Sequence, residues 1–519
     1  MRPILTADEM RAADAWAILH GVSGPTLMEN AGLAVARAIE SRFGKERRVA
    51  ILCGLGNNGG DGFVIARVLK SDWTRVYVIG DPEKITGDAR HHYDRLRKER
   101  ARLQVTHIRT EAEWAAVDPE LARSSLVVDA LLGSGGSGAP RDLFAHAILG
   151  IRRQRARGAR VVSVDLPSGV PADGGTFDWT TVEADLTVTF AAKKPCLVFS
   201  PASELAGSVV VAPIGIKDEG LQFSERGFRF FELEESDARA AFPPRPKNSH
   251  KGDFGHVLVI AGSVGKAGAA VLAARGAFRA GAGLVTVASV SEVCRIVTAA
   301  QPEVMTASLG EGAECGDAVR ATGTVLDLLA TMDALVIGPG LGRTQKTVDF
   351  VLDVVARCGL SVVIDADGLY SLNAHTIARI AQRDAPTILT PHPGEMARLL
   401  GSSNAEVQAD RVKALRRAVS ETRSTVVLKG MHTLIGNSRS EVWLNPTGGA
   451  SLATAGTGDV LAGAIGALAA RGLAADVAAA AAVYVHGLAG ERAGKRRPWG
   501  VMAGDVAEAL PKAIASLGR

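Results

Sequence analysis

Short, continuous runs of Val, Ile and Leu recur along the first part of the chain, and most are followed by glycine and a segment with helical spacing. The runs lie at residues 49–56, 76–80, 126–133, 161–169, 185–192 and 208–216. Runs that are apolar at every position are typical of strands buried on both faces of a parallel sheet. Ahead of them, Thr6 and Glu9 have the spacing of a capping box, which predicts that a helix begins there.

A second set of apolar runs follows, at residues 256–263, 284–290, 334–342, 361–369, 387–395 and 424–430. Strands that alternate with helices again predict an α/β layer fold. Between the two sets, charged residues and the sequence PPRP are typical of a linker. We therefore predict two α/β domains, residues 1–225 and 246–519, joined by a linker at 226–245.

Length and charge agree with this division and exclude some classes of partner. A chain of 519 residues is long enough for more than one domain, since domains hold roughly 100–200 residues. The net charge of +4 gives no indication of a nucleic-acid partner. We interpret the basic clusters at 95–102 and 152–160 as solvated helix faces, with the steering of anions as the alternative.

The cysteines and the apolar segments favour a reduced, cytoplasmic protein. None of the five cysteines belongs to a CxxC pair, which argues against a zinc site or a disulfide framework. The first residues lack the apolar core of a signal peptide. The Ala-rich segment 460–490 is interrupted by Arg471, Asp476 and His486, so it predicts buried helices and no membrane partner.

Polar residues of the first domain are expected to meet at one rim of its sheet. The glycines of GLGNNGGDG (54–62) let the backbone approach a ligand closely, and a helix predicted from about 62 to 70 would point its N-terminus at that ligand. Asp129 and Asp165 end two predicted strands, and Ser168 follows shortly. In open parallel sheets, ligands bind beyond the carboxyl ends of the strands.

The side chains at this rim indicate a cation and a proton-transfer group. Asn58, Asp129 and Ser168 offer only oxygen atoms, which suit hard cations. Asp165 is a candidate for proton transfer, and Lys194 is either its cationic neighbour or a surface residue. Turn glycines and helix caps are the alternative, and a cap explains Ser168 alone equally well. The glycine spacing does not match the dinucleotide fingerprint.

The second domain contains a pattern suited to phosphoryl transfer. In ATAGTGDVLAG (453–463), Gly456 and Gly458 would let successive N–H groups face an anion. Asp459 would then lie within reach of a hydroxyl that attacks the phosphorus atom. A capped helix start explains GTGD alone, but its combination with TPHPGE (390–395) and KGMHT (429–433) is more specific. No P-loop motif is present in the sequence.

Other polar residues of this domain leave two interpretations open. His392, between two prolines, is either a satisfied loop histidine or a ligand-binding residue. Asp365 and Asp367 either cap the helix that follows them or line the site, and we expect one of them to cap.

The motifs GLGNNGGDG, VVDALLG, VDLPSG and TFAAKKP resemble those of the NAD(P)H-hydrate epimerases over about residues 1–220. The resemblance implies a three-layer, Rossmann-like domain that interconverts the R and S forms of C6-hydrated NADH or NADPH. It implies Asp165 as the acid–base residue and potassium held by Asn58, Asp129 and Ser168. The implied substrate contacts are Asn57, Asn58, Gly59, Gly60, Asp61, Gly133, Ser134, Gly135, Gly136, Ser137, Gly138, Ala139 and Asp165.

Residues 245–515 resemble the ribokinase-like superfamily, and most closely its ADP-dependent NAD(P)H-hydrate dehydratases. The whole chain thus resembles the bifunctional NAD(P)H-hydrate repair enzymes. The resemblance implies that Asp459 is the catalytic base. The implied ADP contacts are Lys429, Gly430, Met431, His432, Thr433 and Gly458, and the implied hydrate contacts are Ala270, Gly340, His392 and Asp459.

The resemblance also implies a reaction. Asp459 would deprotonate the C6 hydroxyl of the S hydrate, and that oxygen would take the terminal phosphoryl group of ADP before phosphate leaves. Mg²⁺ would accompany ADP, whose preference over ATP rests on family analogy. We expect the two hydrates and ADP as small-molecule partners, and a homo-oligomer.

Two rival functions share these features. One is a small-molecule kinase, of the vitamin type, with a non-catalytic N-terminal binding domain. The other is an N-terminal scaffold module that has lost catalysis. The products discriminate, because a kinase leaves a stable phosphoester whereas a dehydratase releases phosphate.

Overall fold

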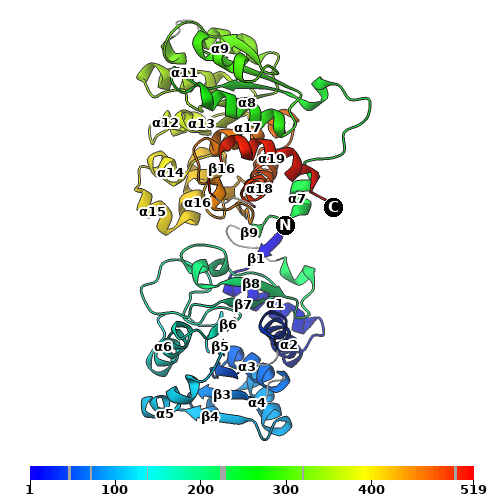
Figure 1. The fold of residues 1–519 in the computed structure, drawn as a ribbon, viewed down its shortest axis with the longest axis vertical. Helices are drawn as coiled ribbons and strands as arrows, with labels where there is room; N and C mark the ends of the chain where they lie inside the picture. The colour runs from blue at the N-terminus through cyan, green and yellow to red at the C-terminus, as the bar shows by residue number, and fades with distance from the viewer. Residues whose placement is uncertain are drawn as a thin grey trace. The chain divides into compact units, whose positions relative to one another are not determined.

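The computed structural model describes residues 1–44, 48–69, 73–136, 138–222, 229–317, 321–495 and 499–518. The chain divides into two compact units (Figure 1): the first is Pro3–Arg226, and the second is Met1–Arg2 with Gly227–Arg519. Both are α/β, as predicted. Among the described residues, no helix is both long and apolar enough to cross a membrane.

The first helix of the first unit begins where the capping box predicted it. Helix α1 (Ala7–Leu19) has Thr6 as its N-cap. The Glu9 N–H donates to the Thr6 hydroxyl, and the Thr6 N–H donates to the Glu9 carboxylate at 2.8 Å. Two otherwise unpaired N–H groups are thereby satisfied, which fixes the start of the helix.

A parallel sheet forms the centre of the first unit, in the order β4-β3-β2-β5-β6-β7-β8. All six predicted runs contain a strand, but β4 was not predicted because its sequence, QVTHI, is polar and only partly buried. The strands are β2 (Arg48–Cys53), β3 (Trp73–Ile79), β4 (Gln104–Ile108), β5 (Leu126–Ala130), β6 (Arg160–Val164), β7 (Leu186–Phe190) and β8 (Ser208–Ala212).

Helices cover both faces of this sheet, which explains its uninterrupted apolar runs. Along β2, Ile51 packs into a core with helices α2 (Gly24–Phe43), α3 (Asn57–Val68) and α4 (Gly87–Glu99). The next residue, Leu52, packs into a second core with α5 (Glu111–Leu121) and α6 (Asp142–Ala156). Successive strand residues point to opposite faces, so both must be apolar. Three layers result, as expected.

The glycine motif departs from its predicted structure, because α3 begins at Asn57 rather than near residue 62. Gly59 and Gly60 therefore lie in the first turns of the helix. A Cβ at Gly59 would lie 1.9 Å from the Gly54 carbonyl oxygen, and one at Gly60 would lie 2.5 Å from Met28 Sδ. These glycines allow the helix to pack against the strand end and against α2.

The sheet of the second unit runs β9-β18-β17-β16-β15-β14-β13-β10-β11-β12. The strands from β16 to β12 are parallel, and β17 is antiparallel to both of its neighbours. All six predicted runs contain a strand. The strands are β9 (Arg229–Glu232), β10 (His256–Ile260), β11 (Leu284–Ser289), β12 (Met305–Ser308), β13 (Ala334–Ile337), β14 (Ser361–Ile364), β15 (Thr387–Leu389), β16 (Thr425–Leu428), β17 (Leu434–Gly436) and β18 (Glu441–Leu444).

The segment that we predicted as a linker, 226–245, contains regular structure. Strand β9 pairs in parallel with β18, and helix α7 (Glu235–Ala240) follows it. Phe231 packs against the core of the second unit, while the charged residues around it lie at the surface. Charge at a sheet edge therefore resembled the composition of a linker.

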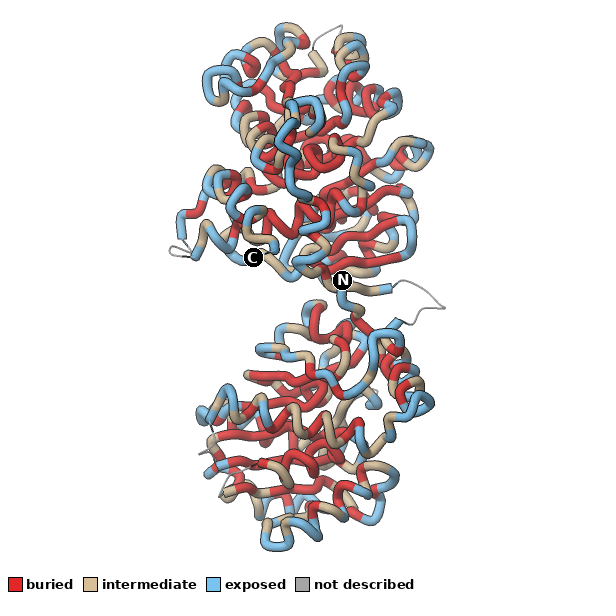
Figure 2. The backbone as a smooth tube through the Cα atoms, turned by 90° about the vertical axis from the view of Figure 1, so that its right-hand side faces the viewer, coloured by how far each residue is buried: buried red, intermediate tan, exposed pale blue. Residues whose placement is uncertain are grey.

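Three helices pack on one face of the second sheet: α8 (Ala267–Arg279), α17 (Thr457–Ala470) and α18 (Ala475–Gly494). Buried backbone runs through the strands and these helices (Figure 2). Helices α8 and α17 pack almost backbone to backbone, because a Cβ at Gly276 would lie 2.2 Å from the Val460 carbonyl oxygen. Helix α17 begins within ATAGTGDVLAG, one of the motifs that predicted a phosphate site.

Candidate active sites

A cavity of about 660 Å³ opens at the carboxyl ends of the first unit's strands. Helices α1 and α2 line one part of it, and the start of α3 and the segments after β5, β6 and β7 line another. Its lining includes the predicted residues Asn57, Asn58, Asp61, Gly133, Ser134, Gly135, Gly136 and Asp165. Gly59, Gly60, Gly138 and Ala139 are not part of the lining, and Ser137 lies outside the described residues.

Asp165 and Lys194 form a buried ion pair in this cavity. Lys194 is only 1% exposed, and its Nζ lies 2.6 Å from Asp165 Oδ1, 2.9 Å from Thr189 Oγ1 and 3.0 Å from the Phe190 carbonyl oxygen. Lys194 is therefore the cationic neighbour of Asp165 rather than a surface residue. Asp165 also has a φ of 62°, which costs a residue with a Cβ roughly 1–3 kcal/mol and is typical of functional sites.

Two further carboxyls of this cavity hold their protons more tightly than usual. Burial raises the pKa of Asp61 well above its ordinary value, and the neighbouring Asp165 and Asp14 add to the effect. Burial also raises the pKa of Asp14, to about 6, although Lys194 opposes the shift. The cavity thus combines an ion-paired carboxylate with two carboxyls that are protonated more readily, an arrangement suited to acid–base chemistry.

Two of the three predicted cation ligands, Asp129 and Ser168, are in direct contact, and the third, Asn58, lines the cavity. Asp129 is fully buried and accepts hydrogen bonds from Ser168 Oγ at 2.5 Å, Ser168 N at 2.8 Å and Ser163 Oγ at 2.8 Å. Asn58 is buried, and its amide Nδ2 has no hydrogen-bond partner among the described residues.

These residues fit a cation. Asp129 forms no ion pair with any described residue, and burial raises its pKa in spite of its hydrogen bonds. A positive ion beside its carboxylate would offset that burial, and the oxygen atoms of Asn58 and Ser168 are suitable further ligands. The chemistry of Asn58, Asp129 and Ser168 is therefore compatible with their predicted role as potassium ligands.

In the second unit, Asp459 lies at the start of α17, next to an ion pair. Lys429 Nζ lies 2.8 Å from Asp365 Oδ1 and 3.8 Å from Glu395 Oε2. A Cβ at Gly458 would lie 3.3 Å from Lys429 Nζ, so the lysine meets the helix N-terminus. A helix N-terminus and a lysine together attract phosphate.

The charges of this cluster shift one another. Burial raises the pKa of Asp459 to about 7, and the nearby Asp365 carboxylate contributes. Burial alone would lower the pKa of Lys429, but the carboxylates of Asp365 and Glu395 outweigh it and raise that pKa. At neutral pH the lysine is charged while Asp459 is poised between its two forms, as a general base should be.

Asp365 and Asp367 both face the site, so the expectation that one caps a helix is wrong. Helix α12 (Asp367–Tyr370) has no side-chain cap. Asp365 accepts from Lys429 and, at 2.6 Å, from Thr390 Oγ1. Asp367 accepts from Lys266 at 3.1 Å, from Arg343 at 2.6 Å and from the Gly342 N–H at 3.0 Å.

The KGMHT segment is a loop after β16, and the partly buried Arg411 holds it. Arg411 donates to the carbonyl oxygens of Met431, Leu428 at 3.2 Å and Lys429 at 3.4 Å. Burial lowers its pKa to about 10, and it forms no ion pair within the described part of the chain. Because the carbonyls face Arg411, the N–H groups of Gly430 and Met431 remain free of hydrogen bonds to described residues.

The predicted hydrate contacts of the second unit differ in their exposure and surroundings. His392 is exposed and serves as the N-cap of α14 (Pro393–Leu400), accepting from the Gly394 N–H at 3.1 Å. Gly340 has a φ of 63° and packs on the start of α8, where its Cβ would meet Ala269. Ala270 has no exposed surface, so its side chain does not line an open pocket as we expected.

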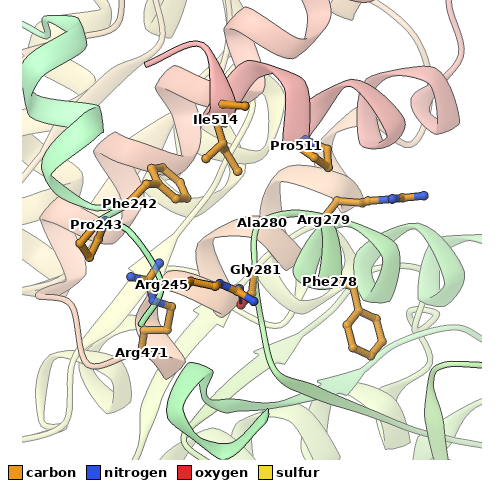
Figure 3. Close-up of a pocket in the computed structure, with 11 residues that line it drawn as sticks. Phe242, Pro243, Arg245, Phe278, Arg279, Ala280, Gly281, Arg471, Pro511 and Ile514 are labelled. Carbon is orange, nitrogen blue, oxygen red and sulfur yellow. Dashed lines mark hydrogen bonds between the residues drawn. The ribbon is translucent and has the colours of Figure 1, made fainter. Parts of the chain in front are cut away.

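A further cavity, of about 370 Å³, lies where α8, α17 and α19 (Ala503–Ala515) end (Figure 3). Arg245, Arg279 and Arg471 line it. Arg245 donates to the Gly281 carbonyl oxygen at 2.6 Å, and Arg279 pairs with Glu508. Helix C-termini carry partial negative charge, which attracts arginines. No ligand is needed to explain why three arginines lie there.

Three of the residues that matter in these sites were not singled out from the sequence as site residues. Asp14 and Arg411 lie in helical segments with many other charges, where a solvated face is the ordinary expectation. Glu395 was quoted only as part of TPHPGE. A strand-end motif signals a site through its glycines, but a helix gives no such signal.

Comparison with known proteins agrees with this architecture. Residues 24–196 match the family described as YjeF-related protein N-terminus, and residues 257–512 match the family described as NAD(P)H-hydrate dehydratase. The bifunctional NAD(P)H-hydrate repair enzyme Nnr of Moorella thermoacetica is 40% identical over 99% of this chain and 97% of its own. Its Escherichia coli counterpart is 33% identical over 98% and 93%.

Solved structures were also similar to the second unit. The ADP/ATP-dependent NAD(P)H-hydrate dehydratase from Bacillus subtilis, co-crystallised with ATP and Mg²⁺, is 30% identical. The similarity covers 57% of this chain and all of that one, with a TM-score of 0.49.

The fold and these matches together define an α/β enzyme with two domains, an epimerase domain and a dehydratase domain. The matches extend over nearly the full length of this chain and of its relatives. The chain belongs to the family of bifunctional NAD(P)H-hydrate repair enzymes.

Proposed function

We propose that this protein repairs hydrated NADH and NADPH. The first unit interconverts the R and S hydrates, and the second dehydrates the S form at the expense of ADP, giving AMP and phosphate. The observation that carries the proposal is the cluster of Asp459, Lys429 and Asp365 at the start of α17, where a poised base meets a phosphate-binding helix end.

In the second unit, Asp459 takes the proton of the C6 hydroxyl, and the oxygen attacks the terminal phosphorus of ADP. The bond between that phosphorus and AMP breaks, while Lys429 and the α17 N–H groups hold the phosphate oxygens. The C6–O bond then breaks with electrons from the ring nitrogen, phosphate departs, and loss of a C5 proton restores the dihydronicotinamide.

The nucleotide would lie against the loop Lys429–Thr433 and Gly458. The free N–H groups of Gly430 and Met431 support this placement, because they can donate to phosphate or to the nucleoside. Mg²⁺, when bound with the nucleotide, supplies positive charge to the phosphate oxygens.

In the first unit, Asp165 is the acid–base residue and Lys194 fixes its carboxylate. Asn57 and Asp61 would contact the hydrate from the start of α3. Asn58, Asp129 and Ser168 would hold potassium, which supplies positive charge at the rim of the sheet. None of the proton transfers depends on that ion.

An assay on a mixture of both hydrate epimers tests the proposal. We expect full recovery of the dihydronicotinamide absorbance with ADP, together with one phosphate for each molecule recovered. ATP in place of ADP, and potassium present or absent, are the paired conditions. A stable phosphoester without recovery of NADH would contradict the proposal in favour of the kinase alternative, which the family membership does not favour.

A further inference from the structure

Asp14 faces the first cavity, and no capping, hydrogen-bonding or ion-pairing role among the described residues explains its position. It lies in α1, is half-buried and lines the cavity. It makes no hydrogen bond or ion pair within the described part of the chain, whereas Thr6 and Glu9 already provide the cap of its helix. Removing a carboxyl from water without a partner lowers the stability of the fold. Such a residue therefore suggests a role in function.

The charged groups that line this cavity with Asp14 come from several elements. They are Arg11 of α1, Asp61 of α3, Asp88 of α4, Asp165 after β6 and Lys194 after β7. Lys194 is the cation that acts on Asp14, but its Nζ is already bonded to Asp165. Burial therefore prevails, and the pKa of Asp14 rises to about 6.

Epimerisation at C6 requires proton transfer in two places. The hydroxyl must leave one face of the ring as water, and water must add to the other face. Two carboxyls in different protonation states can carry out both transfers, because one gives a proton while the other receives one. Asp165 is ion-paired with Lys194, and burial raises the pKa of Asp61 well above its ordinary value.

We infer that Asp14 is the second proton-transfer residue of the first site, working with Asp165, which lines the same cavity. This inference rests on the proposed epimerase function. The Asp14 proton passes to the C6 hydroxyl, the C6–O bond breaks, and the lone pair of N1 forms an N1=C6 double bond. Water adds to the other face, N1 regains its lone pair, and the water proton passes to Asp165.

The step is neutral in redox terms, and water is its only co-reactant. Asp14 loses one proton and Asp165 gains one, so solvent or the reverse turnover restores the starting state. The direction that starts from protonated Asp14 should therefore slow as the pH rises through about 6.

The test uses the full chain with NADH hydrate and measures epimerisation separately from each epimer. Asp14→Asn should lower kcat about 100-fold or more, the usual contribution of a general acid or base, and leave KM within about threefold. The pH limb near 6 should disappear, and Asp14→Glu should restore part of both. Dehydration of the S hydrate by the same preparation reports that the variant is folded.

Asp118→Asn is the matched control, because Asp118 is a partly exposed carboxylate of the first unit that pairs with Arg153 and does not line this cavity. Its kcat and pH profile should equal those of the unchanged protein. If Asp14→Asn keeps its kcat and its pH profile, or changes KM alone, the inference is overturned while the epimerase function stands. If the unchanged chain does not epimerise the hydrate at all, the proposed function itself fails.

Discussion

Asp459 shows how one buried carboxyl affects both activity and stability. Its pKa of about 7 means that the base form increases as the pH rises through neutrality. We expect the initial rate of dehydration to rise over that range and then level off. Asp459→Asn should abolish dehydration, and a variant that retains the activity with an unchanged pH profile would contradict the assignment of Asp459 as base.

The same shift makes Asp459 unfavourable for the folded state. Its pKa is higher in the folded protein than the ordinary value of 3.8, so the charged form is less stable there than in the unfolded chain. This destabilisation of the folded state is fully present above about pH 7 and disappears as the pH falls toward 4. Asp459→Asn should therefore raise the Tm of the nucleotide-free protein at pH 8, and raise it less at pH 5.

The buried Asp129 gives a test of the potassium site that does not depend on activity. Replacing sodium with potassium should raise the Tm of the unchanged protein, because only a bound ion offsets the buried carboxylate. Asp129→Asn should remove this difference. Asp185→Asn is a control, because Asp185 is also a first-unit carboxylate but pairs with Arg160. A potassium effect that persists in Asp129→Asn would place the ion elsewhere.

Asp165 was singled out because it ends a predicted strand near other oxygen-bearing residues, and Asp459 because it follows the glycines of GTGD at a helix start. Their roles stay predictions. Asp14 lies in a helix whose surface is mostly charged, so only the fold shows that it faces a cavity. The capping expectation for Asp365 and Asp367 was wrong because it considered only residues near in sequence, whereas Lys429 and Lys266 are distant.

At the scale of elements, the close contact of α8 and α17 fixes the geometry of the phosphate site. Gly276→Ala would place a Cβ 2.2 Å from a carbonyl oxygen, so the helices must separate. We expect a loss of about 1–3 kcal/mol in the free energy of unfolding, measured by chemical denaturation. Gly268→Ala, in the same helix but with open space around it, should be neutral or stabilising. Equal effects of the two substitutions would contradict this account.

Three of the strands missed by the sequence analysis share one physical property. Strands β4, β9 and β12 lie at or near the edges of their sheets and are only partly buried, so their residues do not form an apolar run. Strands β17 and β18 were also missed although they are buried, and they have only three and four residues. The early start of α3 was missed because residues 58–62 include three glycines, and glycine is a poor helix former. Tertiary packing overrides that preference in the folded protein.

At the scale of the whole molecule, the two sites lie in separate compact units, so the loss of one should leave the other intact. Asp165→Asn should convert only the S half of a mixed hydrate within the time of the assay, and Asp459→Asn should convert none. A mixture of the two full-length variants should convert both halves, because the substrate can diffuse between them. Failure of that mixture, with both variants folded, would contradict two independent centres.

The arginine that holds the nucleotide loop also has a thermodynamic consequence. Arg411 orders the loop before any ligand arrives, so folding rather than binding carries the entropy of ordering it. The cost is that the Arg411 guanidinium is partly removed from water without an ion-pair partner among the described residues. Ligand that binds only the folded state adds about 2.7 kcal/mol at one hundred times its Kd. The repair enzyme should thus resist heat best in cells whose adenine nucleotide pool is full, and become a substrate for proteolysis when that pool is depleted.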